Sequence, residues 1–142
     1  YHDALATELR RLHNQHDRVV LWEGHSIRGH CPFLFEGRLP DFNLGTSDGA
    51  SCSRGLQGAL EHVLAAQAGY DHVINGRFKG GYITRHYGDP RRGIDAVQLE
   101  ISQRIYLDEA SHAWDEERAR KTRTVIHALL EAAIRQGSEI TP

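Results

Sequence analysis

His25 and Glu100 are side chains of the types that can bind a metal ion and activate water. His25 follows Gly24 and precedes Ser26, just after the apolar run of residues 19–22. A neutral imidazole is a common zinc ligand, and hydrolytic zinc sites use three protein ligands and one water. One histidine cannot hold zinc, so an ordinary surface or hydrogen-bonded histidine is the alternative interpretation.

Glu100 lies in an apolar strand pattern, between Leu99 and Ile101. A carboxylate buried there is costly unless it is paired. Burial also raises a carboxyl pKa, which suits a general base. Alternation along residues 96–101 places Glu100 and Gln98 on one face of the strand. The alternative interpretation is that this face is solvated.

A third candidate region is the stretch of residues 75–88, which is rich in glycine, aromatic side chains and positive charge. The planar guanidinium groups of Arg77 and Arg85 suit carboxylates, and glycines let a backbone approach a ligand closely. A nucleic-acid surface and a solvated charged hairpin are the alternatives. Separately, Cys52 among ten histidines allows a Cys–His nucleophilic pair as a further hypothesis.

The elements that position these side chains alternate between helix and strand, which is typical of an α/β fold. Apolar residues at helical spacing indicate helices over residues 1–16, 53–67 and 115–137. Apolar or alternating runs indicate strands over residues 19–22, 72–75, 81–85 and 96–101, and a short strand within residues 39–46. A turn is expected at residues 23–26, and residues 27–51 form a long connection of the kind that often carries function.

Composition is that of an ordinary globular chain. With 142 residues, we expect a single domain over residues 1–142. The net charge of −2 argues against a nucleic-acid partner, and the short apolar runs argue against a membrane span. Two cysteines suit a reducing, cytoplasmic compartment. The chain lacks methionine and begins within a helical pattern, so we expect it to be a piece of a longer protein.

Four segments together resemble one enzyme family. They read WEGHSI, LPDFNLGT, NGRFKGGYITRHYG and AVQLE, at residues 22–27, 39–46, 75–88 and 96–100. Their content and order resemble the N-formylglutamate amidohydrolase family, and residues 75–88 are the most specific part. The resemblance covers most of the chain but only the C-terminal half of the family's domain. The family's earlier metal ligands, in a Pro-His motif with a nearby carboxylate, have no counterpart in the chain.

The resemblance implies both a fold and an activity. The fold would be a mixed sheet flanked by helices, similar to zinc metallocarboxypeptidases and of the phosphorylase/hydrolase-like kind. The activity would be metal-dependent hydrolysis of N-formyl-L-glutamate to formate and L-glutamate, as in histidine degradation. The substrate would be a small molecule, and the sequence leaves the oligomeric state open.

The resemblance also implies roles for individual residues. His25 would bind Zn²⁺, or another divalent metal such as Co²⁺, with the other ligands in a missing N-terminal half. Glu100 would be the base that activates water. By chemistry, Arg77 and Arg85 would hold the substrate carboxylates with help from Asn75, and one of these arginines would stabilise the oxyanion.

Two other functions fit the same residues. The chain could be a non-catalytic module that binds acidic amino acids or peptides through Arg77 and Arg85. It could also be a related zinc amidase that acts on another N-acyl amino acid.

Overall fold

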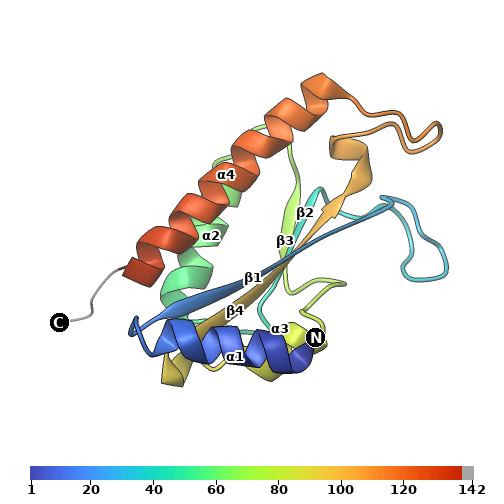
Figure 1. Cartoon of the computed structure of the whole chain (residues 1–142). Coiled ribbons are helices and arrows are strands. Elements are labelled where there is room, and N and C mark those ends of the chain that lie inside the picture. The colour runs from blue at the N-terminus through green and yellow to red at the C-terminus, as the bar shows by residue number, and fades with distance from the viewer. Residues whose placement is uncertain (139–142) are drawn as a thin grey trace.

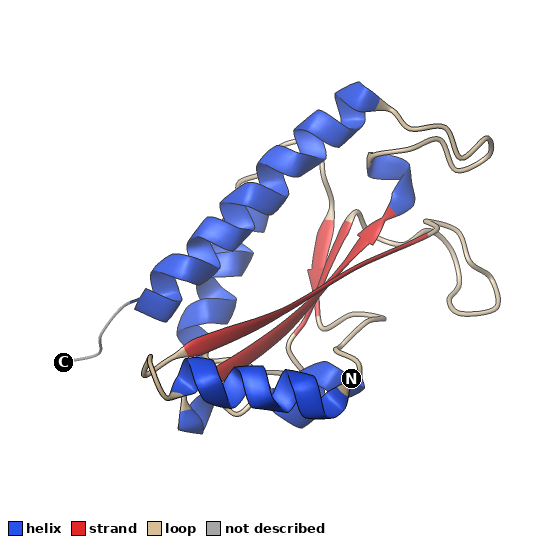
Figure 2. Ribbon diagram, viewed as in Figure 1, coloured by secondary structure: helices blue, strands red, loops and turns tan. Residues whose placement is uncertain are grey.

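The computed structural model describes residues 1–138, which form a mixed α/β structure around a four-stranded sheet (Figures 1 and 2). The strands are β1 (Val19–Ile27), β2 (Phe42–Gly45), β3 (His72–Ile74) and β4 (Ile94–Ser102). Their order across the sheet is β1-β4-β2-β3. The pairs β1–β4 and β2–β3 are parallel, and β2–β4 is antiparallel. The expected mixed sheet flanked by helices is therefore present.

Helices cover one face of the sheet and lie at one of its ends. They are α1 (His2–His13), α2 (Arg54–Ala65), α3 (Tyr82–Tyr87) and α4 (Glu116–Ser138), with 3-10 turns η1 (Pro90–Arg92) and η2 (Gln103–Ile105). The helices α2 and α4 pack together on one face, and α1 and α3 lie near each other at the lower end in Figure 1. Among the described residues, no helix is long and apolar enough to cross a membrane.

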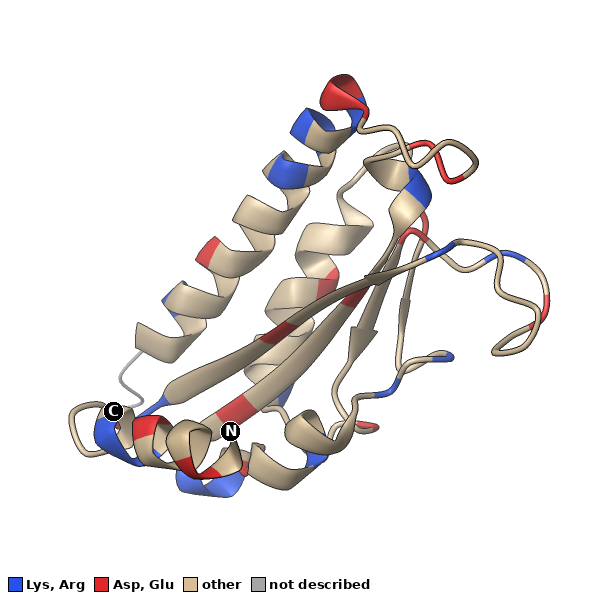
Figure 3. Ribbon diagram, turned by 45° about the vertical axis from the view of Figure 1, so that its right-hand side comes forward, with Lys and Arg blue, Asp and Glu red and all other residues tan. Residues whose placement is uncertain are grey.

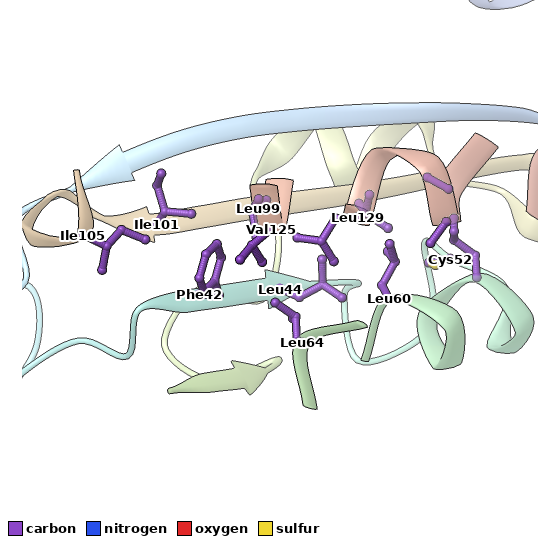
Figure 4. Packing of buried hydrophobic residues seen from close by; sticks show 14 residues of the cluster. Phe42, Leu44, Cys52, Leu60, Leu64, Leu99, Ile101, Ile105, Val125 and Leu129 are labelled. Carbon is purple, nitrogen blue, oxygen red and sulfur yellow. The ribbon is translucent and has the colours of Figure 1, made fainter. Parts of the chain in front are cut away.

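The hydrophobic core lies between the sheet and the pair α2–α4 (Figure 4). Strand alternation directs one set of side chains toward these helices: Phe42, Leu44, Val97, Leu99 and Ile101. The helices contribute Leu56, Leu60, Leu64, Val125 and Leu129. Fully burying one such side chain stabilises the fold by about 1.5–3 kcal/mol. Because this face is apolar, the polar residues of the same strands must emerge on the other face.

The start of α2 is fixed by a buried carboxylate on β4. Ser53 caps the helix by accepting a hydrogen bond from the Leu56 amide, as the sequence predicts. Asp95, only 1% exposed, accepts the Ser53 backbone N–H at 2.5 Å and pairs with Arg18 at 2.7 Å. These contacts connect α2 to the sheet, and they account for the burial of the Asp95 carboxylate.

Two predictions about local structure are wrong. Residues 81–85 are not a strand, because they lie at the start of the helix α3. Contacts with neighbouring strands hold that helix: the Gly81 amide donates to Gln98 Oε1 at 2.6 Å, and the Thr84 hydroxyl donates to Glu23 Oε2 at 3.1 Å. Residues 23–26 are not a turn either, since β1 pairs with β4 continuously as far as Ile27.

Candidate active site

Glu100 lies at the centre of a polar row that crosses three strands. It is the register partner of His25 on the parallel strand β1 and of Asn43 on the antiparallel strand β2. Neighbouring strands lie about 4.8 Å apart, so the three residues are adjacent on the face opposite the core. The structure thus brings together His25 and Glu100, which are 75 positions apart in the sequence. Figure 3 shows acidic residues along these strands.

Burial changes the acidity of Glu100. The residue is only 7% exposed, so the interpretation that its face is solvated is wrong. Loss of hydration raises the pKa of the Glu100 carboxyl above its ordinary value, and the charge of nearby His25 partly opposes this shift. Its Oε1 atom is buried and has no hydrogen-bond partner among residues 1–138, and the same holds for Oδ1 of Asn43. Two buried acceptors in register can therefore receive hydrogen bonds from a bound water or substrate.

His25 is the accessible member of the row. Its side chain is 49% exposed, and its Nε2 atom lies 3.7 Å from Oε1 of Glu23. Glu23 is in turn held by the Thr84 hydroxyl. An open imidazole with a carboxylate beside it suits a metal ligand with an orienting partner.

The described residues fit only part of a zinc site. Within residues 1–138, no group of three or more His, Cys, Asp or Glu side chains is placed to hold a metal ion. A catalytic zinc needs three protein ligands, and His25 could serve as one of them.

Beside this row lies a cavity of about 430 Å³ that is lined by cations. We call it the basic cavity: it is lined by Arg77, Phe78, Lys79, Gly80, Gly81, Arg85 and Gln98. Arg77 and Arg85 therefore line one cavity, and Lys79 lines it as well. Gln98 connects the cavity to the polar row, because it precedes Glu100 by two residues on the same face of β4.

The cations of the basic cavity are oriented by neighbouring groups. Arg77 Nε donates to the carbonyl oxygen of Leu34 at 2.7 Å, and Arg85 Nη1 donates to the carbonyl oxygen of Gly80 at 2.5 Å. A guanidinium has five N–H donors, so each arginine keeps further donors for a ligand. The cavity is thus suited to an anion such as a carboxylate.

Asn75 has a different environment from the arginines. Its backbone has a φ of 53°, in the left-handed region. Its side-chain Oδ1 accepts the Thr46 amide at 2.8 Å, and its Nδ2 donates to the Thr46 hydroxyl at 2.9 Å. Both ends of the amide therefore hold the segment that follows β2. This arrangement positions the loop of residues 76–81, and Asn75 does not line the basic cavity.

The loop reaches the sheet only because residue 45 is glycine. A Cβ atom on Gly45 would lie 2.6 Å from the Gly80 nitrogen and 2.6 Å from the Lys79 carbonyl carbon. Such distances are shorter than real contacts, and backbone atoms cannot move aside cheaply. The LPDFNLGT segment thus supplies both Asn43 and the close approach that forms the basic cavity.

Sequence reasoning missed several residues of this region. Glu23, Asn43, Lys79 and Gln98 were not assigned roles, although alternation places Glu23 and Gln98 on the faces of His25 and Glu100. The hypothesis of a Cys52 nucleophile loses support, because that thiol is 2% exposed and burial raises its pKa to about 12. A thiol is a poor nucleophile when it stays protonated.

Comparison with known proteins identifies the family of this chain. The model of the N-formylglutamate amidohydrolase family matches residues 1–107. An N-formylglutamate deformylase from Pseudomonas aeruginosa is 54% identical over 98% of this chain and 53% of its own length. A protein of the same name from Pseudomonas putida is 51% identical over 98% of this chain and 52% of its own length.

A solved structure of the same family has a similar fold. The crystal structure of N-formylglutamate amidohydrolase from Ralstonia eutropha JMP134 superposes with a TM-score of 0.81 at 27% identity. The superposition covers 95% of this chain and 51% of the Ralstonia eutropha chain. The chain thus spans about half the length of the relatives it matches. Because the family model covers most of the chain and both curated relatives match nearly all of it, the chain belongs to the N-formylglutamate amidohydrolase family.

Proposed function

We propose that this chain carries the water-activating base and the substrate-binding cations of an enzyme that hydrolyses N-formyl-L-glutamate to formate and L-glutamate. The observation that carries the proposal is the adjacency of the buried Glu100 to a cavity lined by Arg77, Lys79 and Arg85. The names of the two Pseudomonas relatives support the choice of substrate. The substrate has two carboxylates, which need cations, and one amide, which needs an activated water.

In this mechanism Glu100 acts as general base. Its raised pKa makes it a better proton acceptor than an ordinary glutamate once it is ionised. It takes a proton from water as the water oxygen attacks the formyl carbon, and it returns that proton to the nitrogen as the C–N bond breaks. Arg85 donates hydrogen bonds to the developing oxyanion and Arg77 to a substrate carboxylate.

We further propose that His25 provides one ligand of a zinc or other divalent metal site that other residues complete. A metal held there would supply Lewis-acid polarisation of the formyl carbonyl. The proposal also includes a single-domain organisation, a fold relation to zinc metallocarboxypeptidases, and action in the cytoplasm. The chain would then be one half of a larger catalytic unit.

Formate release tests the proposed activity. The chain is assayed alone and co-expressed with the part of the Pseudomonas aeruginosa relative that it does not match. We expect formate from N-formyl-L-glutamate, released much faster than larger acids from acetyl- or propionyl-L-glutamate. Equal rates across the panel would favour the related amidase. No acid release in either preparation would contradict the hydrolase.

One observation favours a second function, a non-catalytic module for acidic amino acids. The basic cavity lies within the described chain, whereas a three-ligand metal group is absent from residues 1–138. Binding could therefore persist without metal. The module predicts L-glutamate affinity that EDTA does not change, together with no formate release. Calorimetry with no heat from L-glutamate would exclude it.

A further inference from the structure

Gln98 is a buried polar residue of the basic cavity, and only one end of its amide has a partner. The residue is 7% exposed, and its Oε1 accepts the Gly81 backbone N–H at 2.6 Å. Because a backbone N–H is a donor, it fixes the oxygen end of the amide on that side. The Nε2 group, with its two hydrogens, has no hydrogen-bond partner among residues 1–138 and belongs to the side chain that lines the cavity.

The position of Gln98 relative to Glu100 sets which part of a substrate it can reach. The two residues share one face of β4 and are two positions apart, which corresponds to about 6.6 Å along a strand. In an acylated glutamate, the α-carboxylate is attached to the carbon next to the scissile nitrogen. The side-chain carboxylate is much farther from that nitrogen. A substrate whose amide carbon lies at Glu100, and whose side chain runs toward the basic cavity, would place its side-chain carboxylate near Gln98.

Resting on the proposed function, we propose that Gln98 is a specificity-determining residue whose Nε2 hydrogens donate to the side-chain carboxylate of the substrate. The cations Arg77 and Lys79 line the same cavity and supply the opposite charge, Lys79 while it also pairs with Asp48 at 3.1 Å. A side-chain N–H donor gains more from a charged acceptor than from a neutral one. Gln98 would thus help the site prefer an acidic side chain over a neutral one.

Replacement by glutamate separates this role from a purely structural one. Gln98→Glu keeps an oxygen for the Gly81 N–H, so the anchor of the loop is retained. It replaces the two Nε2 donors with a negative charge that faces the cavity. If Gln98 only anchors the loop and the ligand carboxylate binds away from it, the variant binds like the wild type. If Gln98 contacts the carboxylate, the variant repels it.

The test measures binding of L-glutamate and L-glutamine to the 142-residue chain by calorimetry. For Gln98→Glu we expect L-glutamate affinity to fall about 10- to 100-fold, with L-glutamine affinity changed much less. Gln15→Glu, the same charge change at an exposed position, is the control and should leave both affinities unchanged. An unchanged L-glutamate affinity in Gln98→Glu, or an equal loss for both ligands, would overturn the inference.

A measurement on the wild-type chain avoids dependence on the variant's folding. The side-chain NH₂ signals of Gln98 in a ¹⁵N–¹H spectrum should shift when L-glutamate is added. Signals that stay fixed while the amides of residues 77–81 move, or no binding at all, would overturn the inference. The two proposals fail separately: shifted Gln98 signals without formate release contradict only the hydrolase, and formate release with fixed Gln98 signals contradicts only the role of Gln98.

Discussion

Glu100 and His25 lie side by side as register partners on the parallel strands β4 and β1. Glu100 is buried and His25 is exposed. The burial of Glu100 raises the pKa of its carboxyl, and the charge of His25 lowers it. The acidity of the proposed base thus depends on a residue of another strand.

The charge of His25 can be removed without changing β4. In His25→Ala, the Glu100 carboxylate loses its opposing charge, and burial alone then determines its shift. We expect the pKa of Glu100 to rise above its wild-type value, measured by the pH dependence of its ¹³C carboxyl signal. His127→Ala is a matched control, because His127 lies exposed on α4 and pairs with Glu131. An unchanged or lower Glu100 pKa in His25→Ala would contradict the coupling.

The buried Glu100 carboxylate should also cost stability. Because its folded pKa is raised, the folded state binds a proton more tightly, and its stability falls as pH rises from the unfolded value, about 4.3, through the folded one. Glu100→Gln removes this charge. We expect the variant to unfold at a temperature a few degrees higher than the wild type at pH 7 and to lose that advantage near pH 4. Scanning calorimetry at both pH values checks this, and a variant less stable at pH 7 would contradict the account.

Gly45 tests whether the close approach of the loop forms the basic cavity. Gly45→Ala places a Cβ against backbone atoms of residues 78–80, which should cost about 1–3 kcal/mol of unfolding free energy and weaken L-glutamate binding. The control is Gly58→Ala on α2, where no atom lies within 4 Å of the added Cβ. That change should stabilise the helix by about 0.5–1 kcal/mol. Urea unfolding and calorimetry compare the two variants, and equal effects would contradict the proposed packing.

The long elements could be predicted from the sequence because their patterns are strong. The periodic leucines of α2 and the Ser53 cap identified that helix, and the expected residues 53–67 include the observed Arg54–Ala65. The strand at residues 96–101 was also found, although β4 extends one residue farther at its C-terminal end and two at its N-terminal end.

The errors came from contacts that no local pattern records. Residues 81–85 have aromatic and β-branched side chains typical of strands, yet Thr84 and Gly81 bind to two different strands and fix a helix instead. The apparent turn at residues 23–26 is strand because β4 pairs with it. Gly24 and Ser26 have low strand propensity, but pairing of β1 with the buried strand β4 outweighs that preference.

The candidate site was predicted in part. Spacing and residue type pointed to His25, Glu100 and the arginines of residues 75–88. The register that places His25 beside Glu100 could not be predicted, because a parallel pairing depends on distant segments. The carboxamide of Asn75 is of a type that can bind a substrate carboxylate, but in the structure both of its ends bind Thr46 and hold the loop in place. Its role toward substrate remains a prediction.

Turnover of Glu100→Gln tests most directly whether Glu100 activates water. The variant is compared with wild type in the preparation that releases formate from N-formyl-L-glutamate, with Glu61→Gln on the exposed side of α2 as control. We predict that kcat falls about 10²- to 10⁴-fold, while L-glutamate affinity stays within about twofold and Glu61→Gln behaves as wild type. Formate release by Glu100→Gln at a rate near that of the wild type would contradict the account.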